Sequence, residues 1–259
     1  MSSYAELHCL SNFTFLRGAS HPAELVHQAY ALGYRALALT DECSISGVVR
    51  AHVAARELGL QFIIGSEFTL NNGDKFVLLV TNKNGYRQLT RLITLARRRT
   101  PKGEYHLTVD DLRAKSLSDC LSLVVCDPSP TPIERKHAKF QAISDHAKRL
   151  KSLMPNRVWL TLEQPGYGTD ECHQKNLEAL SENLQIPIVA TGNVHMHCRA
   201  RQPLQDTLTA IRHQKSILNI KHCLAANAER HLRSKKILKH LYRKAALNHS
   251  IQIADQCHF

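Results

Sequence analysis

Side chains that can bind metal ions follow a series of short apolar runs in this chain. Seven such runs cover residues 4–8, 36–41, 62–67, 76–81, 121–126, 158–163 and 186–193. Six of them end on or beside a potential ligand: His8, Asp41 with Glu42, Glu67, Cys126, Glu163, and Asn193 with His195. Imidazole, carboxylate and thiolate groups brought together form a site for a divalent transition metal. A bridged pair of such ions can activate water and hold both oxygens of a phosphodiester.

The segments between the runs have the periodicity of helices. Helices are predicted at residues 22–32, 48–58, 84–98, 133–153 and 170–184. The first has Pro22 near its first turn and ends at Gly33. The second is expected to bury an apolar stripe that includes Val49 and Val53. This alternation of strands and helices predicts parallel strands joined by right-handed crossovers.

A barrel would bring the ends of these runs together. In a parallel barrel the carboxyl ends of all strands open onto one face, where such enzymes carry their chemistry. An open doubly wound sheet fits the same alternation, but polar residues at so many strand ends favour a closed or nearly closed barrel. Each residue alone also has a structural explanation, since Asp41 could cap the next helix and Glu67 could be a surface carboxylate. Only their coincidence supports a metal site.

The charge of the chain favours a polyanionic partner. The net charge is +12, and the pI is near 9.5. Residues 200–259 contain eleven Lys or Arg against three Asp or Glu. The candidate DNA-contacting residues are Arg97, Arg98, Arg99, Lys235, Lys236 and Lys239. Such side chains position a duplex without reading its sequence, and solvated helix faces are the alternative explanation.

Composition and local sequence argue against a secreted protein and against a membrane-spanning protein. The first residues contain no basic patch followed by an apolar core, so no secretory signal is predicted. No apolar run approaches the roughly 20 residues that cross a bilayer. The eight Cys form no Cys-x-x-Cys pair and are expected to be reduced. The sequence therefore predicts a cytoplasmic protein without a membrane partner.

The character of the chain changes after Arg199. Helices are predicted at residues 202–212, 233–243 and 244–256, and no strand is indicated there. The segment is basic, and its pattern is still running at the last residue. We therefore expect residues 1–199 to form the barrel and residues 200–259 to be the first helices of something larger.

Several motifs resemble the polymerase-and-histidinol-phosphatase (PHP) domain that begins the bacterial C-family DNA polymerases. Residues 6–18 resemble its first motif, 36–42 and 63–67 the second and third, 80–86 the turn after its fourth strand, and 189–195 its last metal motif. Residues 196–206 and 226–232 are similar to the error-prone branch of that family. The resemblance covers essentially the whole chain.

The resemblance implies an α/β fold in two parts. Residues 1–199 would be a distorted seven-stranded (β/α)7 TIM-like PHP barrel, and residues 200–259 a short basic α-helical segment that begins the approach to the palm. It also implies the amino-terminal part of an error-prone DNA-directed DNA polymerase of damage-induced (translesion) synthesis. Expected partners are DNA, the remainder of the polymerase chain, other translesion-synthesis proteins and the sliding clamp. The palm and its Mg²⁺ lie outside this chain, so no catalytic residue is assigned.

Five positions match the metal motifs of the family. His8 matches the first His of the opening His-x-His, and Asp41 matches the following aspartate. Glu67 matches a carboxylate that bridges metals in the family, and Cys126 stands at a thiol or imidazole position. His195 matches the last His. The resemblance thus implies these five residues as metal ligands.

Four positions depart from those motifs. Leu10 stands at the second His, and Glu42 stands where replicative members have His. Lys75 falls about where the fourth strand of relatives carries His, and Asn193 replaces the final Asp. A cation at Lys75 would repel a divalent metal rather than bind it. These departures remove groups that a multinuclear site needs, so a working phosphoesterase or exonuclease centre is not expected.

Two states of the site remain open from the sequence. One is a single weakly held divalent ion, zinc or manganese, at His8, Glu42, Glu67 and His195. The other is an empty structural pocket. The leading hypothesis is a scaffold for the polymerase. The alternatives are a PHP-type metal-dependent phosphoesterase or 3′–5′ exonuclease, and a non-catalytic nucleic-acid-binding module.

Overall fold

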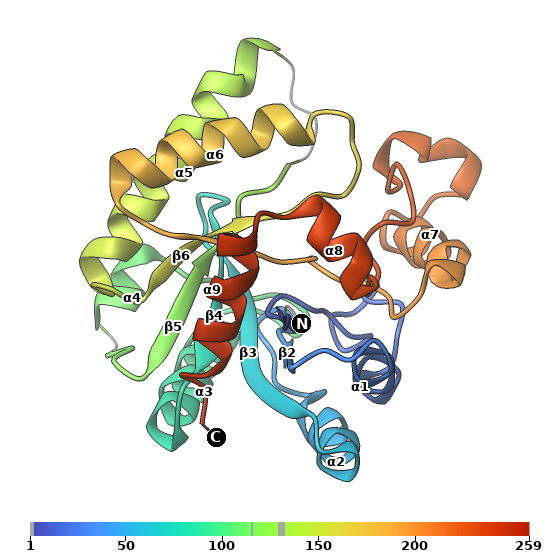
Figure 1. Cartoon of the computed structure of the whole chain (residues 1–259), viewed down its shortest axis with the longest axis horizontal. Helices are drawn as coiled ribbons and strands as arrows, with labels where there is room; N and C mark the ends of the chain where they lie inside the picture. Colours follow the sequence, from blue (N-terminus) through green and yellow to red (C-terminus); the bar gives the residue numbers. More distant parts are fainter. Residues whose placement is uncertain (1–2, 115, 129–132, 259) are drawn as a thin grey trace.

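One curved sheet of seven strands forms the centre of the structure, a computed structural model that describes residues 3–114, 116–128 and 133–258 (Figure 1). The strands are β1 (Ala5–Glu6), β2 (Ala36–Leu39), β3 (Gln61–Thr69), β4 (Lys75–Val80), β5 (Cys120–Val124), β6 (Val158–Leu162) and β7 (Ile188–Ala190). They lie in sequence order across the sheet. The expected α/β fold with seven strands is confirmed, as a mixed half-barrel.

The expectation that all strands are parallel is wrong for β4. This strand pairs antiparallel with both β3 and β5, whereas the other neighbouring pairs are parallel. The chain reverses between Leu70 and Asp74, where the Leu70 amide donates to the Asp74 carbonyl at 2.8 Å and Gly73 has a φ of +88°. So short a turn joins only antiparallel strands. As a result, Lys75 lies at the carboxyl-end mouth of the sheet.

Helices cover the outer face of the sheet. They are α1 (Pro22–Ala31), α2 (Val48–Leu58), α3 (Lys83–Arg97), α4 (Val109–Ala114), α5 (Ile133–Leu153) and α6 (Asp170–Leu184). Further along the chain lie α7 (Gln202–Arg212), α8 (Lys235–Leu241), α9 (Lys244–Ala254) and the short 3₁₀ turns η1 (Arg199–Arg201), η2 (Ile217–Asn219) and η3 (Lys221–Cys223). Apart from α4 and the 3₁₀ turns, the predicted helices coincide with these within a few residues.

Helix α2 buries a narrower face than the sequence predicts. Val49 is 71% exposed and Val53 is 41% exposed. The buried residues are Val48, Ala51, Ala54 and Ala55. Three alanine side chains let the helix backbone approach its neighbours α1 and β3 closely, and Val49 and Val53 remain outside that contact. The predicted burial of Val49 and Val53 is therefore wrong.

Helix α9 lies against the inner side of the sheet and contacts both edge strands, β1 and β7 (Figure 1). Its Ile253 and Ala254 join an apolar core made by the inner face of the sheet. The Ala5 amide in β1 donates to the Ser250 hydroxyl of α9 at 3.2 Å. The last helix of the basic segment thus fills the half-barrel. The division of the chain at residue 199 stays a prediction.

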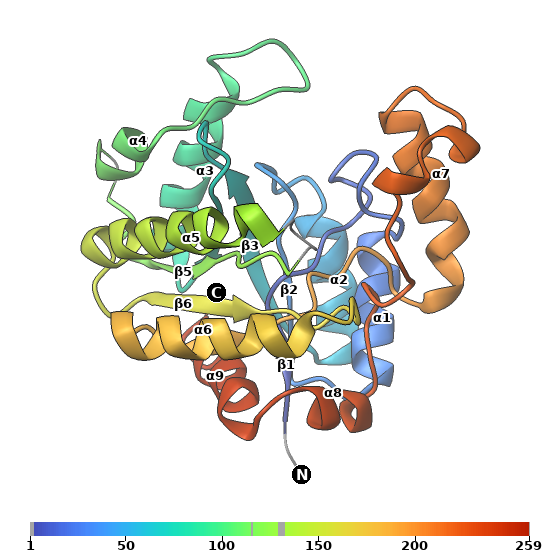
Figure 2. The ribbon, with the colours of Figure 1, turned by 90° about the horizontal axis from the view of Figure 1, so that it is seen from above.

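The mouth of the half-barrel lies at the carboxyl ends of the parallel strands. An isolated parallel bridge between Cys9 and Val194 joins the segments that follow β1 and β7 there. Helix α7 stands beside this mouth, away from the body of the sheet (Figure 2). Within the described ranges, no helix is long and apolar enough to cross a membrane.

Candidate functional site

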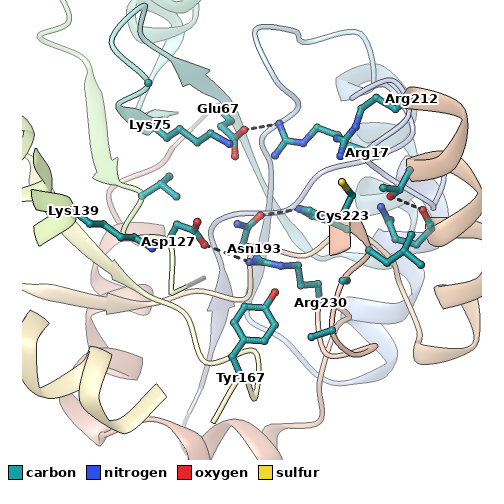
Figure 3. Close-up of a pocket in the computed structure, with 18 of the residues that line it drawn as sticks. Arg17, Glu67, Lys75, Asp127, Lys139, Tyr167, Asn193, Arg212, Cys223 and Arg230 are labelled. Carbon is teal, nitrogen blue, oxygen red and sulfur yellow. Dashed lines mark hydrogen bonds and ion pairs between the residues drawn. The ribbon is translucent and has the colours of Figure 1, made fainter. Parts of the chain in front are cut away.

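A cleft of about 1110 Å³ opens at the mouth of the half-barrel. Three of the predicted ligand positions line it, namely Glu67, Asn193 and His195. Figure 3 shows Glu67 and Asn193 in this lining. Its charged lining consists of Arg17, Lys75, Lys139, Arg212, Lys221 and Arg230 against Glu67, Asp74 and Asp127. The charged groups of the lining therefore have a positive excess.

The first half of the site is a carboxylate pair held by Arg17. Its Nη1 lies 2.8 Å from Glu67 Oε1 and also bonds the Glu42 carboxylate. His8 Nε2 lies 2.8 Å from the other oxygen of Glu67, and the Tyr105 hydroxyl donates to Glu42 at 2.9 Å. Burial alone would raise the pKa of Glu67, but Arg17, the His8 bond and Lys75 hold it well below its ordinary value. Glu67 is therefore an ionised carboxylate, and its counter-charge is a guanidinium.

A tight loop directs Arg17 into the cleft. The preceding Leu16 has a left-handed φ of +59°. The following Gly18 lies so close to the backbone that a Cβ there would stand 1.9 Å from the carbonyl oxygen of Ser11. Only glycine fits such an approach. The sequence Leu16-Arg17-Gly18 thus fixes the position of the cation.

The second half of the site has Glu163 at its centre. Arg230 Nη1 lies 3.0 Å from Glu163 Oε2, and Asn193 Nδ2 lies 3.3 and 3.2 Å from the two carboxylate oxygens. His195 Nε2 lies 3.1 Å from Asn193 Oδ1. His8 Nδ1 lies 3.8 Å from Glu163 Oε1, so the same imidazole faces both halves. A second guanidinium therefore balances the second buried carboxylate. The same guanidinium also lies 3.9 Å from Asp127 (Figure 3).

Burial and the two arginines together keep His195 neutral. Burial lowers the pKa of His195 well below its ordinary value, and the charges of Arg230 and Arg17 lower it further. For Arg230 itself burial opposes the charge, but the Glu163 carboxylate outweighs burial and raises the pKa. The site therefore contains neutral imidazole beside fixed guanidinium cations. Guanidinium groups donate hydrogen bonds and accept none.

Comparison with known proteins identifies the fold family. The PHP domain family matches residues 6–164. The chain belongs to the PHP domain family. It is homologous to the amino-terminal quarter of error-prone DNA polymerases: 47% identical to that of Methylococcus capsulatus over 256 residues, 99% of this chain and 23% of the relative. The polymerase of Dechloromonas aromatica is 47% identical over 263 residues, 100% of this chain and 24% of the relative. The resemblance recognised in the sequence is confirmed.

Solved structures agree with this fold. A protein described as a candidate metal-dependent phosphoesterase from Bifidobacterium adolescentis superposes with a TM-score of 0.51 at 13% identity, over 75% of this chain and 88% of that one. An amidohydrolase from Chromobacterium violaceum, with bound sulfate and no metal, also gives 0.51 at 14% identity, over 75% and 88%. At such identities the likeness shows the fold alone. The chain spans about a quarter of the length of its polymerase relatives.

Metal ions are implied by the PHP family, but the residues of this site do not fit a metal cluster. Arg17 and Arg230 both line the cleft and contact the carboxylates of Glu67 and Glu163. Over residues 3–114, 116–128 and 133–258, no three His, Cys, Asp or Glu side chains are placed to hold one ion. A single zinc or manganese ion at His8, Glu42, Glu67 and His195 stays a prediction of the sequence.

Two of the predicted ligands point away from the cleft of this PHP domain. Asp41 accepts bonds from the Ser11 amide at 2.8 Å, the Ser11 hydroxyl at 2.7 Å and the Thr14 hydroxyl at 2.7 Å. Cys126 is fully buried and donates to the Val124 carbonyl at 3.5 Å. Burial, with the nearby Glu163 charge, raises the pKa of the Cys126 thiol. Asp41 thus organises the loop before Arg17, and Cys126 packs in the core.

The predicted DNA-contacting arginines lie outside the cleft and are largely engaged within the PHP domain. Arg97 donates to the carbonyls of Glu42 and Cys43 at 3.2 Å each and lies over the Tyr105 ring. Arg99 forms two bonds to Asp111 at 2.7 and 2.8 Å. The Arg98 side chain is exposed.

The predicted lysines lie on α8, and no residue of α8 lines the cleft. Lys236 and Lys239 are exposed, and Lys235 lies beside Gly33 at the end of α1. All six basic residues remain predictions as DNA contacts.

Reasoning from strand ends missed the two arginines that hold the buried carboxylates of the site. Arg17 comes from the loop after β1, and Arg230 comes from the segment after η3. Neither follows an apolar run, so the pattern gave no signal for them. Glu163 was recognised as a strand end but was not assigned as a ligand. One signal could have found the arginines. Several carboxylates were expected to be buried together, and positions where relatives carry histidine hold other residues here, so cationic side chains were needed to balance the negative charge.

Proposed function

We propose that this chain is the amino-terminal PHP part of an error-prone DNA polymerase and serves as a non-hydrolytic scaffold for the rest of that polymerase in damage-induced translesion synthesis. One observation carries the scaffold role: Arg17 and Arg230 neutralise the carboxylates of Glu67 and Glu163. No side chain of these two pairs is more than 16% exposed, so both ion pairs are internal contacts of the fold.

The pairing argues against hydrolysis for a physical reason. Metal-dependent hydrolysis of a phosphodiester at neutral pH uses a water of lowered pKa, which divalent ions with open coordination positions supply. A guanidinium carries charge but has no such position, and it does not deprotonate in a protein. Arg17 and Arg230 therefore balance the carboxylates without generating a nucleophile.

The proposed role implies specific partners and cofactors. The remainder of the polymerase chain would hold the palm, its Mg²⁺ ions and the primer–template DNA. Other translesion-synthesis proteins and the sliding clamp are proposed partners of the whole polymerase, and the proposed location is the cytoplasm. These proposals follow from homology to proteins described as error-prone DNA polymerases.

A chimera tests the proposed function. The first quarter of the Methylococcus capsulatus polymerase is replaced by this chain, and primer extension is measured. We expect the chimera to extend primers, and a polymerase lacking that quarter to fail. Labelled single-stranded DNA with Mn²⁺ or Zn²⁺ should remain uncut by the isolated chain. An inactive, aggregated chimera would count against the scaffold role, and cutting that Glu67→Ala abolishes would support the phosphoesterase alternative.

A second candidate function is non-catalytic binding of nucleic acid in the cleft. Lys75, Arg212 and Lys221 line it, and they form no ion pair among the residues that the structure describes. If DNA binds there, the logarithm of its affinity should fall linearly with the logarithm of salt concentration. Replacing Lys75 and Arg212 by Met should make that slope shallower. An unchanged slope and affinity would exclude the cleft as the binding surface.

A further inference from the structure

Arg17 lies at the point on which two carboxylates converge. Glu42 follows β2 and Glu67 lies in β3, and an isolated parallel bridge joins the backbones of these two residues. Both carboxylates contact the same atom, Arg17 Nη1, and Figure 3 shows its contact with Glu67. The bridge belongs to the sheet and not to the Arg17 loop. Glu42 and Glu67 therefore stay neighbours whichever cation lies between them.

An imidazole lies directly beside this carboxylate pair. His8 Nε2 lies 2.8 Å from Glu67 Oε2. His8 is fully buried, and its Nδ1 has no hydrogen-bond partner among the residues that the structure describes. Carboxylate and imidazole donors suit Zn²⁺ and Mn²⁺, and three protein donors with a water molecule can hold one zinc ion. Glu42, Glu67 and His8 are therefore sufficient in number and type for a single ion, though not for a cluster.

Two features of the chain could keep a metal ion away from these donors. One is the loss of family ligands at Leu10 and Asn193. The other is competition, because Arg17 neutralises the carboxylates that an ion would need. Burial raises the pKa of Glu67, and the charge of Arg17 is the largest single effect that outweighs burial and lowers it. The electrostatics of the site therefore favour competition as the cause.

We propose that Arg17 excludes divalent metal ions by competition, so that removing its guanidinium lets Glu42, Glu67 and His8 bind one ion. With Arg17 in place, an ion must first displace the guanidinium from both carboxylates. Breaking a buried pair is costly, so Arg17 weakens metal binding by a factor of about 100 or more. The proposal concerns the cause of metal exclusion, so it can fail while the scaffold role stands.

Metal titration of the variant Arg17→Met tests the proposal. The parent chain and the variant are freed of metal with a chelator and titrated with Mn²⁺ and Zn²⁺ by calorimetry. We expect the variant to bind one ion more per chain than the parent, with an affinity at least about a hundredfold above any binding of the parent at this site. The ion should also raise the Tm of the variant and not that of the parent, because binding to the native state stabilises it.

Three matched variants locate the added ion. Arg17→Lys keeps a cation beside the carboxylates, so it should gain no ion. Arg99→Met removes a guanidinium that pairs with Asp111 at 40% exposure, and it should gain none either. Adding Glu67→Gln to Arg17→Met removes one carboxylate of the pair and should abolish the added ion. This pattern would assign the ion to the position of the Arg17 guanidinium.

A refolding measurement covers the case in which metal-free Arg17→Met does not fold. Its refolding from urea is followed with and without Mn²⁺, through the fluorescence of Trp159 in β6. A divalent ion would take over the charge balance that the guanidinium supplied, so folding that requires Mn²⁺ supports the proposal. Failure to fold in both conditions overturns it.

The outcomes separate this proposal from the scaffold role. A folded Arg17→Met variant without an added ion assigns metal exclusion to the missing ligands, which overturns the proposal and leaves the scaffold role to the chimera experiment. An added ion that persists with Glu67→Gln lies elsewhere and overturns the proposal too. A parent chain that binds the ion as tightly as the variant, and cuts DNA with it, overturns both.

Discussion

Replacing Arg17 by Met should destabilise the fold strongly, because it leaves two carboxylates facing each other. Arg17 is the shared partner of Glu42 and Glu67, with side-chain exposures of 16%, 24% and 1%. Methionine retains much of the volume of the aliphatic stem and removes only the charge and the hydrogen bonds. The buried Glu67 would then keep a single direct partner, His8 at 2.8 Å.

The expected magnitude follows from the burial of the pair. Removing one partner of a buried ion pair costs about 3–5 kcal/mol, because the other charge stays buried without compensation. The His8 bond to Glu67 persists, so we expect the lower end, about 3 kcal/mol. For a domain of this size, that lowers Tm by about 6–12 °C. Adding Glu67→Gln removes the orphaned charge and should recover about 2 kcal/mol as a coupling between the two sites.

Urea unfolding measures these changes through the single tryptophan. Trp159 lies in β6 and is 7% exposed, so its fluorescence reports unfolding of the sheet. The control is Arg99→Met, since Arg99 also forms two short bonds to carboxylate oxygens, at 2.7 and 2.8 Å from Asp111, but is 40% exposed. Solvent screens exposed pairs, so this variant should cost far less. Equal losses for Arg17→Met and Arg99→Met, or no recovery with Glu67→Gln, would refute the reasoning.

Three further predictions concern groups outside this pair. Burial lowers the pKa of His146 to about 4, so the unfolded chain binds a proton more readily and stability falls as pH drops from about 6.5 towards 4. His146→Phe should remove about 2 kcal/mol of that loss of stability at pH 5. Urea unfolding at several pH values measures the effect, and a pH profile unchanged by the substitution would contradict the prediction. Gly18→Ala should cost about 2 kcal/mol or more, because its Cβ would meet the Ser11 carbonyl, and a neutral effect on Tm would show that the loop yields. Thiol titration of the native chain should modify the exposed Cys172 well before the buried Cys126, and equal rates would mean that the core opens readily.

Periodicity alone predicted most of the framework. The helices at 48–58, 133–153 and 170–184 were predicted at the bounds that α2, α5 and α6 have. The bounds of a helix depend on nearby residues, namely the spacing of its apolar side chains and the glycines that end it. The seven strands were also recognisable, because each is a short apolar run between turns or helices.

Long-range geometry could not be predicted in the same way. The direction of β4 depends on a short reversal before Lys75, which strand–helix alternation does not reveal. The burial of α9 inside the half-barrel depends on the small side chains of the inner face, such as Ala36 and Ala38. Its sequence alone indicated only a helix of the basic segment.

The candidate site was predicted in part. Glu67 and His195 meet at the mouth as the strand-end pattern suggested, and His8 lies between the two carboxylates. Arg17 and Arg230 could not be placed there, since both come from irregular segments whose direction only the fold determines. Charge balance was the missing consideration, because buried carboxylates need cations and arginine can supply them as well as a metal.

Measuring the metal bound to the purified protein tests whether guanidinium groups or metal ions balance the charge of the buried carboxylates. The chain is purified from cells grown with added zinc and manganese, dialysed, and assayed for bound metals and for the change of Tm with chelator. We expect less than about a tenth of an equivalent of metal and an unchanged Tm, because metal that held the cluster would also stabilise the fold. Two or more ions per chain that survive dialysis, with a Tm that falls on chelation, would contradict neutralisation by Arg17 and Arg230.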